Sequence, residues 1–154
     1  MKQSARAVIV KDGNILLMKR FKMGQEYYTL LGGGVNPGEK PEAAALREVI
    51  EESTVVAGGP SLVFIEEAGD PFGPQYIYLC DYISGEPRLP AESEEAFWST
   101  EGKNTYEPMW FPFSDLGTIP FVSPLLREAL IIARDKGFPE KPYEFSSQHA
   151  SRLS

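Results

Sequence analysis

Apolar runs divided by turn-forming residues predict β-strands in the first part of the chain. Residues 5–11 are rich in β-forming side chains, and Asp12-Gly13 is a strong signal for a hairpin turn. Residues 14–20 (NILLMKR) predict the returning strand, whose nearly continuous apolar centre indicates burial on both faces. We expect a loop over residues 21–26 and a short strand over residues 27–31, which leads into a run of glycines.

A second group of strands is predicted beyond the middle of the chain. The sequence Ala57-Gly58-Gly59-Pro60 predicts a break, and residues 61–67 and 75–83 predict two strands on either side of a Gly- and Pro-rich turn. The later strand alternates, and one of its faces carries Tyr76, Tyr78, Cys80 and Tyr82. We interpret this aromatic stripe as core or sheet surface in preference to a platform for stacking bases.

The next segment, residues 84–108, is long, acidic and weakly patterned, so we expect a loop that is either functional or disordered. Residues 108–113 (PMWFPF) predict a strand at a sheet edge, because Pro112 has no N–H to donate.

Two segments carry the signals of helices. Residues 41–53 have Pro at the first turn, an Ala-rich centre and no Gly. Residues 123–136 begin with an N-cap serine, Ser123, and end before Gly137. Strands on both sides of the first helix, followed by a second helix, predict an α+β fold with a mixed sheet between helices.

Composition narrows the class of protein. A chain of 154 residues suits one domain, which we place at residues 1–137, followed by a C-terminal tail over residues 138–154. The net charge of −7 argues against a nucleic acid polymer or a membrane surface as partner. The single cysteine, Cys80, leaves no disulfide framework, and we find no apolar run typical of a signal peptide, so we expect a cytoplasmic protein.

The first helix carries the candidate chemistry. At about 100° per residue, Glu48, Glu51 and Glu52 share one helix face, and Arg47 flanks it. Anions this close repel one another unless a cation lies among them. All-oxygen ligands suit a hard divalent ion, Mg²⁺ or Mn²⁺, better than zinc. The glycines 32–34, just before, allow close approach of the backbone to a ligand, and a carbonyl there can serve the same metal.

The spacing of these residues resembles the signature of a known family. Residues 33–52 read G-x5-E-x7-R-E-apolar-x-E-E, which resembles the Nudix box of the Nudix hydrolases. Two positions depart from the usual pattern: Thr54 stands where the family has Gly, and Leu31 where close relatives usually have Pro. Neither departure removes a carboxylate. A purely structural acidic helix remains the alternative interpretation.

The resemblance implies an α/β/α sandwich and a hydrolase that cleaves a nucleoside diphosphate linked to another group, using Mg²⁺ or Mn²⁺. By the motif match, Glu48 and Glu52 would bind the metal, and Glu51 would be a third ligand or the general base. The Gly32 carbonyl would complete the metal shell, and Arg47 would orient a glutamate. Glu39 could pair with Arg47 or bind a second ion.

In several Nudix subfamilies the base comes from a loop beyond the sheet, where Glu101 and Glu107 are the candidates here. For substrate binding, Arg20 resembles a basic residue that many Nudix enzymes place near the substrate, although a solvated charge at a strand end is an equal alternative. Tyr28 is a candidate for stacking on a base, and Gly33 and Gly34 for close backbone contact.

The sequence leaves the substrate open. A nucleoside triphosphate is favoured by the short chain, and ADP-ribose, a nucleotide sugar or a dinucleoside polyphosphate are alternatives. A catalytically silent Nudix module that binds a nucleotide also stays open, as does a homodimer. At Thr54 we expect the backbone to leave the helix by an extended path, because a β-branched residue tolerates the left-handed conformation poorly.

Overall fold

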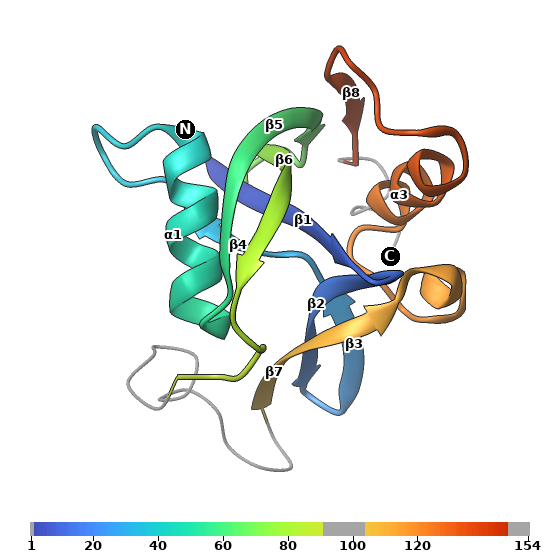
Figure 1. Cartoon of the computed structure of the whole chain (residues 1–154). Coiled ribbons are helices and arrows are strands. Elements are labelled where there is room, and N and C mark those ends of the chain that lie inside the picture. Colours follow the sequence, from blue (N-terminus) through green and yellow to red (C-terminus); the bar gives the residue numbers. More distant parts are fainter. Residues whose placement is uncertain (1, 91–103, 148–154) are drawn as a thin grey trace.

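The computed structural model describes residues 2–90 and 104–147. In this part of the chain, eight strands form a mixed sheet, with helix α1 (Pro41–Ser53) on one side and helix α3 (Pro124–Lys136) on the other (Figure 1). A short 3₁₀ helix, η1 (Phe113–Thr118), precedes α3. No helix in these residues has the length and apolar character needed to cross a membrane. The predicted α+β class and the arrangement of layers are confirmed.

The strand order places the N-terminal strand at the centre. The order is β3-β2-β1-β6-β5-β8, with β4 also paired to β1 and β7 to β2. The β1–β6 and β5–β8 pairs are parallel, and the other pairs are antiparallel. The strands are β1 (Ser4–Lys11), β2 (Asn14–Lys22), β3 (Gln25–Thr29), β4 (Leu31–Gly34), β5 (Val56–Glu67), β6 (Pro74–Ser84), β7 (Asn104–Pro112) and β8 (Tyr143–Ser146).

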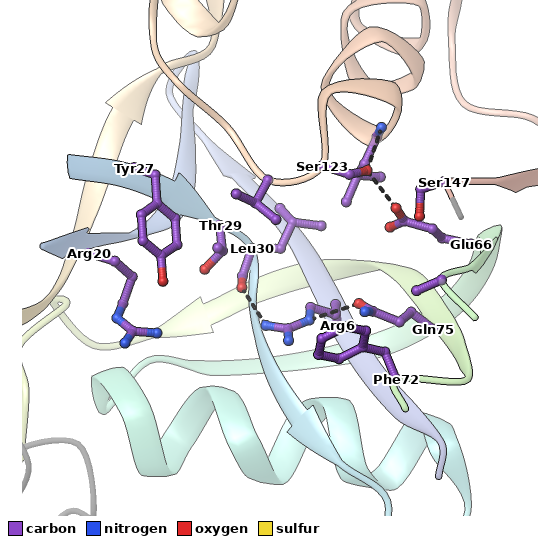
Figure 2. Close-up of a pocket in the computed structure, with 13 residues that line it drawn as sticks. Arg6, Arg20, Tyr27, Thr29, Leu30, Glu66, Phe72, Gln75, Ser123 and Ser147 are labelled. Atoms are coloured by element: carbon purple, nitrogen blue, oxygen red, sulfur yellow. Dashed lines mark hydrogen bonds between the residues drawn. The ribbon is translucent and has the colours of Figure 1, made fainter. Parts of the chain in front are cut away.

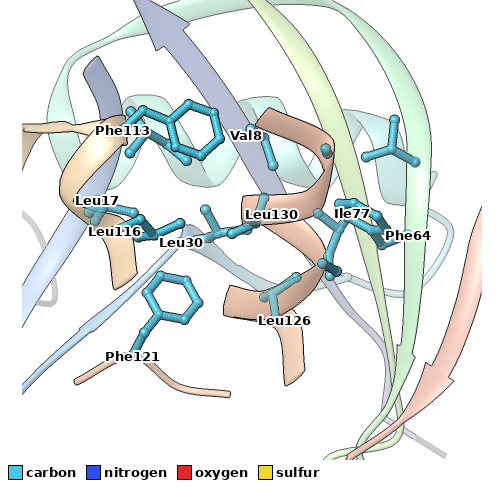
Figure 3. Packing of buried hydrophobic residues seen from close by; sticks show 14 of the residues in the cluster. Val8, Leu17, Leu30, Phe64, Ile77, Phe113, Leu116, Phe121, Leu126 and Leu130 are labelled. Atoms are coloured by element: carbon cyan, nitrogen blue, oxygen red, sulfur yellow. The ribbon is translucent and has the colours of Figure 1, made fainter. Parts of the chain in front are cut away.

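The core has two layers, one on each face of the sheet. In β2, Ile15 and Leu17 pack in the layer that contains Leu130 of α3, shown in Figure 3. Leu16 of the same strand packs in the other layer, under α1. The predicted burial of this strand on both faces is therefore confirmed. The aromatic stripe of β6 also packs under α1, as the core interpretation required.

Two predictions about the chain before the glycines were wrong. The expected loop at residues 21–26 is a tight hairpin, in which Met23 and Gly24 both have positive φ between β2 and β3. The single strand expected at residues 27–31 is two strands, because β3 pairs with β2 whereas β4 pairs with β1. The glycines therefore belong to β4, and Gly32 lies so close to β1 that a Cβ would be 2.2 Å from the Ala5 carbonyl oxygen.

Two further boundaries differ from expectation. The break expected at residues 57–60 lies inside β5, where a register shift between Gly58 and Ser61 absorbs the irregular residues without ending the strand. The loop expected up to residue 108 ends earlier, because β7 begins at Asn104 and pairs with β2 along its whole length. In both cases hydrogen bonding to a neighbouring strand, β6 for β5 and β2 for β7, decides the conformation over the weak local sequence pattern.

Both helices have the predicted ends. Helix α1 spans Pro41–Ser53, and α3 begins after Ser123, whose side chain accepts a hydrogen bond from the Leu126 N–H, and ends at Gly137. Beyond Gly137, the segment expected to be a tail contributes β8, which runs parallel to β5.

The end of α1 contradicts our expectation for Thr54. This residue has φ of 65° and ψ of −1°, the left-handed conformation, and its N–H donates to the Ile50 carbonyl. The gain that offsets the strain lies outside the helix: the Thr54 hydroxyl donates to the Glu86 carbonyl at 3.0 Å, and the Arg88 N–H donates to the Ser53 carbonyl. Contacts between residues this far apart in the chain are not visible in a local pattern.

We expect Thr54→Gly to change the free energy of unfolding little, because relief of about 1–2 kcal/mol of strain is offset by the lost hydrogen bond and by a more flexible unfolded chain. The isosteric Thr54→Val keeps the strain and loses the hydrogen bond, so it should be the less stable variant, by about 1 kcal/mol. Urea denaturation measures both. A Val variant more stable than the Gly variant would contradict the strained conformation.

Candidate metal and substrate site

Arg47 is the centre of the acidic cluster on α1. Its guanidinium binds both oxygens of Glu39, with distances of 2.8 Å from Nε and 3.0 Å from Nη2. Nη1 donates to Glu48 at 3.0 Å and to Glu51 at 3.1 Å, and Nη2 also donates to the Gly34 carbonyl at 3.1 Å. One cation therefore joins three carboxylates and the end of β4. The pairing of Arg47 with Glu39 is present, and the contacts with Glu48 and Glu51 are those that a residue orienting a glutamate would make; the role itself stays a prediction.

The electrostatics of the cluster follow from this contact. The two-pronged hydrogen bond from Arg47, together with the Asn36 N–H, lowers the pKa of Glu39 to about 2. In return, Glu39 first and Glu48 second raise the pKa of the Arg47 guanidinium above its ordinary value. Both groups are therefore charged at every pH at which the protein would function.

Glu52 differs from its neighbours, because it turns inward. Its side chain is buried, and its Oε1 accepts a hydrogen bond from the Gly32 N–H at 3.0 Å. Next to it, Gly33 lies against Glu48: a Cβ on Gly33 would be 2.6 Å from the Glu48 carboxyl carbon. Gly33 thus makes room for the Glu48 carboxylate, whereas Gly32 contributes its N–H to Glu52 and is kept without a side chain by the β1 backbone.

The donor set fits a hard divalent cation. Three glutamates from one helix face and the backbone of a glycine strand supply only oxygen ligands. In the part of the chain that the structure describes, no three acidic, histidine or cysteine side chains converge as they would around an ion. The reason is visible in the contacts, since Glu48 and Glu51 are drawn to Arg47 whereas Glu52 is drawn to Gly32. An ion would compete with Arg47 for Glu48 and Glu51.

A cavity of about 320 Å³ lies on the other face of β1 and β4, near the N-terminus of α3 (Figure 2). Its size is at the lower end of the range for small-molecule sites. It is connected to the cluster through β4, because Leu30 lines the cavity and Gly32, two residues on, contacts Glu52. The lining residues are Arg6, Arg20, Tyr27, Thr29, Leu30, Glu66, Ala68, Phe72, Gln75, Val122, Ser123, Leu126 and Ser147.

The residues predicted to bind substrate are divided between cavity and core. Arg20 lines the cavity, with its guanidinium carbon 3.8 Å from the centre of the Tyr106 ring. Tyr28 lies in the core, where its ring packs against Phe111, and its neighbour Tyr27 faces the cavity instead. Neighbouring side chains of a strand point to opposite faces, so Tyr27 reaches the cavity and Tyr28 the core. Tyr28 was selected in place of Tyr27, and the strand expected at residues 27–31 is β3 at Gln25–Thr29.

The candidates for a loop base have different outcomes. Glu101 lies outside the described residues. Glu107 lies in β7, where it is exposed and opposite Lys19 of β2, so the expectation that it belongs to a loop was wrong. On α1, the side chain of Glu51 is 54% exposed, the most accessible carboxylate among those that contact Arg47.

Most residues of the cavity were not predicted from the sequence. Arg6 lies inside an apolar strand, Glu66 near the end of one, and Gln75 at the start of the next. The one available signal was a polar residue at an inward position of an apolar strand, which applies to Arg6 and Glu66. Ser123 was predicted only as a helix cap.

Comparisons with known proteins agree with this geometry. The model of the NUDIX domain family matches residues 1–130. The NAD-capped RNA hydrolase NudC of Edwardsiella ictaluri is 34% identical over 100 residues, which are 62% of this chain and 39% of that protein. The oxidized purine nucleoside triphosphate hydrolase of Danio rerio is 33% identical over 121 residues, 74% of this chain and 66% of that protein.

A solved structure shares the fold. The MutT NUDIX hydrolase of Burkholderia pseudomallei superposes with a TM-score of 0.60 at 27% identity, covering 82% of this chain and 94% of that one. The chain belongs to the Nudix family. It spans only 39% of the NudC protein it matches, so the activity and substrates of that relative are not transferred to it.

We expect Gly33→Ala to weaken metal binding, because the new Cβ would displace the Glu48 carboxylate. Gly34→Ala is the matched control: its Cβ would meet nothing within 4 Å. The measurement is the thermal shift on titration with Mg²⁺ or Mn²⁺. A Gly33→Ala protein that responds to metal like the Gly34→Ala protein would show that the position of Glu48 does not matter for the ion.

Acid should destabilise the protein through Glu39. Because its pKa falls from 4.5 to about 2 on folding, the stabilisation is fully present above pH 4.5 and is lost as the pH falls towards 2. Glu39→Gln should lower stability at pH 7 and flatten the dependence between these two pH values. Urea denaturation at several pH values measures this, and parallel curves for the two proteins would contradict the ion pair.

Proposed function

We propose that the chain is a pyrophosphohydrolase that cleaves the diphosphate linkage of a nucleoside diphosphate derivative, with a nucleoside triphosphate as the first candidate substrate. The observation that carries this proposal is that the acidic face of α1 and the cavity adjoin the same short stretch of chain: Gly32 contacts Glu52, and Leu30, two residues earlier, lines the cavity. The diphosphate of a substrate would lie at the acidic face, its nucleoside would lie in the cavity, and the bond between them would pass Gly32 and Leu30.

A divalent Mg²⁺ or Mn²⁺ ion held by Glu48, Glu52 and Glu51, with the Gly32 carbonyl, would supply charge neutralisation and an acidified water. The chain itself contributes the rest. Arg47 holds Glu48 and Glu51 in place through Nη1, and β4 offers Gly33 and Gly34 without side chains in the way of a ligand.

A proton must leave the attacking water, and a carboxylate must accept it. Glu51 suits this role by its exposure and because, among the described residues, its side chain accepts only a shared hydrogen bond from Arg47. Glu101 is the alternative base, and Glu107, fixed in β7, is the weaker candidate.

The relatives define the substrate panel. One is named for oxidized purine nucleoside triphosphates and others for NAD-capped RNA, so both a triphosphate and a dinucleotide linkage are suitable tests. ADP-ribose and a nucleotide sugar complete the panel. We expect the protein to hydrolyse at least one substrate of this panel, and we expect it to act in the cytoplasm. If it hydrolyses none of them, a catalytically silent nucleotide-binding module would be the remaining function.

We expect Glu52→Gln to reduce turnover by on the order of 10²-fold or more, since charged metal ligands contribute several kcal/mol to catalysis. The fold should survive, because a Gln oxygen can still accept the Gly32 N–H. Glu42→Gln, which removes a charge from the same helix at its first turn, is the control and should retain activity. Full activity in the Glu52→Gln protein would contradict the proposal that Glu52 is a ligand of the divalent ion.

A further inference from the structure

Glu66 is a buried carboxylate that faces the cavity. It is 3% exposed, near the end of β5, and its Oε2 accepts a hydrogen bond from the Ser123 hydroxyl at 2.5 Å. Among the described residues its other oxygen, Oε1, has no hydrogen-bond partner. A buried carboxylate is costly unless its oxygens accept hydrogen bonds. The half that faces the cavity therefore calls for an N–H or O–H donor on a ligand.

Hydrogen-bond donors lie beside this acceptor. Gln75 of β6 is the direct cross-strand partner of Glu66, so the two side chains lie on the same face of the sheet. The Gln75 oxygen already accepts from Arg6 Nε at 3.2 Å, which leaves its amide N–H groups as donors. Arg6 itself is held by the Leu30 carbonyl through Nη1 at 3.0 Å, and both residues line the cavity.

An anionic group fits this place poorly. Glu66 would repel a phosphate or a carboxylate at close range. Arg6 is already engaged with Gln75 and Leu30. Arg20, whose buried Nε has no hydrogen-bond partner among the described residues, lies beside Tyr27 on the opposite side of the cavity from Glu66 (Figure 2), so an anionic group would bind there and not at Glu66. A neutral, flat group with N–H donors next to an acceptor satisfies Glu66 and Gln75 together, and Phe72 and Tyr27 line the cavity for contact with its faces.

We infer that Glu66 is a specificity-determining residue that accepts N–H groups from the base of the substrate, and that the cavity selects a guanine-type base. This base presents two adjacent N–H donors, at N1 and N2, beside the O6 acceptor. Glu66 can accept one donor at the free Oε1 and the other at the second lone pair of Oε2, and Gln75 can donate to O6. Adenine offers one donor group on that edge, and unsubstituted purine offers none. The inference rests on the proposed function and names the base within its substrate class.

The test is equilibrium binding of nucleoside monophosphates without metal, measured by calorimetry on the full chain. For the wild type we expect GMP to bind about 10-fold or more tightly than the monophosphate of purine riboside, with IMP between them. Glu66→Gln replaces half of the acceptor by a donor and should weaken GMP binding about 10-fold or more. Glu67→Gln is the matched control, since this exposed neighbour lies outside the cavity and should bind GMP within about twofold of wild type.

Equal binding of GMP and the purine monophosphate by the wild type would overturn the inference, as would unchanged GMP binding in Glu66→Gln. If the Glu66→Gln protein does not fold, the wild-type ligand series decides alone. Binding needs no hydrolysis, so the two proposals fail separately. Selective GMP binding without turnover would remove only the proposed function, and turnover without base selectivity would remove only the inference.

Discussion

The structure of the site depends on one guanidinium among three carboxylates. Like charges on adjacent turns of a helix oppose its formation, and Arg47 reverses the sign of that interaction by donating to Glu39, Glu48 and Glu51. Its fifth contact, to the Gly34 carbonyl, fixes α1 against β4. A lysine could match the charge but not the planar fork that binds both oxygens of Glu39 while reaching two other partners.

The central strand then relates the two halves of the site. β1 pairs with β4, which carries the glycines, and with β6, which carries Gln75. Because side chains alternate across a strand, Ala5 packs under α1 while Arg6 reaches into the cavity on the opposite face. The small residue leaves room for the helix, and the long one supports the cavity. The register of a single strand thus sets the position of the cavity relative to the acidic cluster.

Much of the fold could be predicted because its signals are local. Pro41, the alanines and the regular spacing of the glutamates define α1 to the residue, and the Ser123 cap does the same for α3. Predictions failed where distant pairing decides the conformation. Thr54 adopts the left-handed conformation with support from Glu86 and Arg88, and nothing in residues 41–56 announces those partners. The same holds for Glu66, which is a site candidate only because β6 and the start of α3 lie beside it.

The hydroxyl of Ser123 has consequences for how such a cavity can change over evolution. It accepts the Leu126 N–H at the start of α3 and donates to Glu66, so one atom serves both the cap of a helix and the orientation of a carboxylate. Asp is an equally good cap, but it would set a second carboxylate against Glu66, whereas Thr would preserve both contacts. An apolar residue at 66 would leave the serine proton without its acceptor. A substitution at residue 66 or at residue 123 therefore limits which residues are tolerated at the other position. A change in base preference would arise most readily when both residues are substituted together.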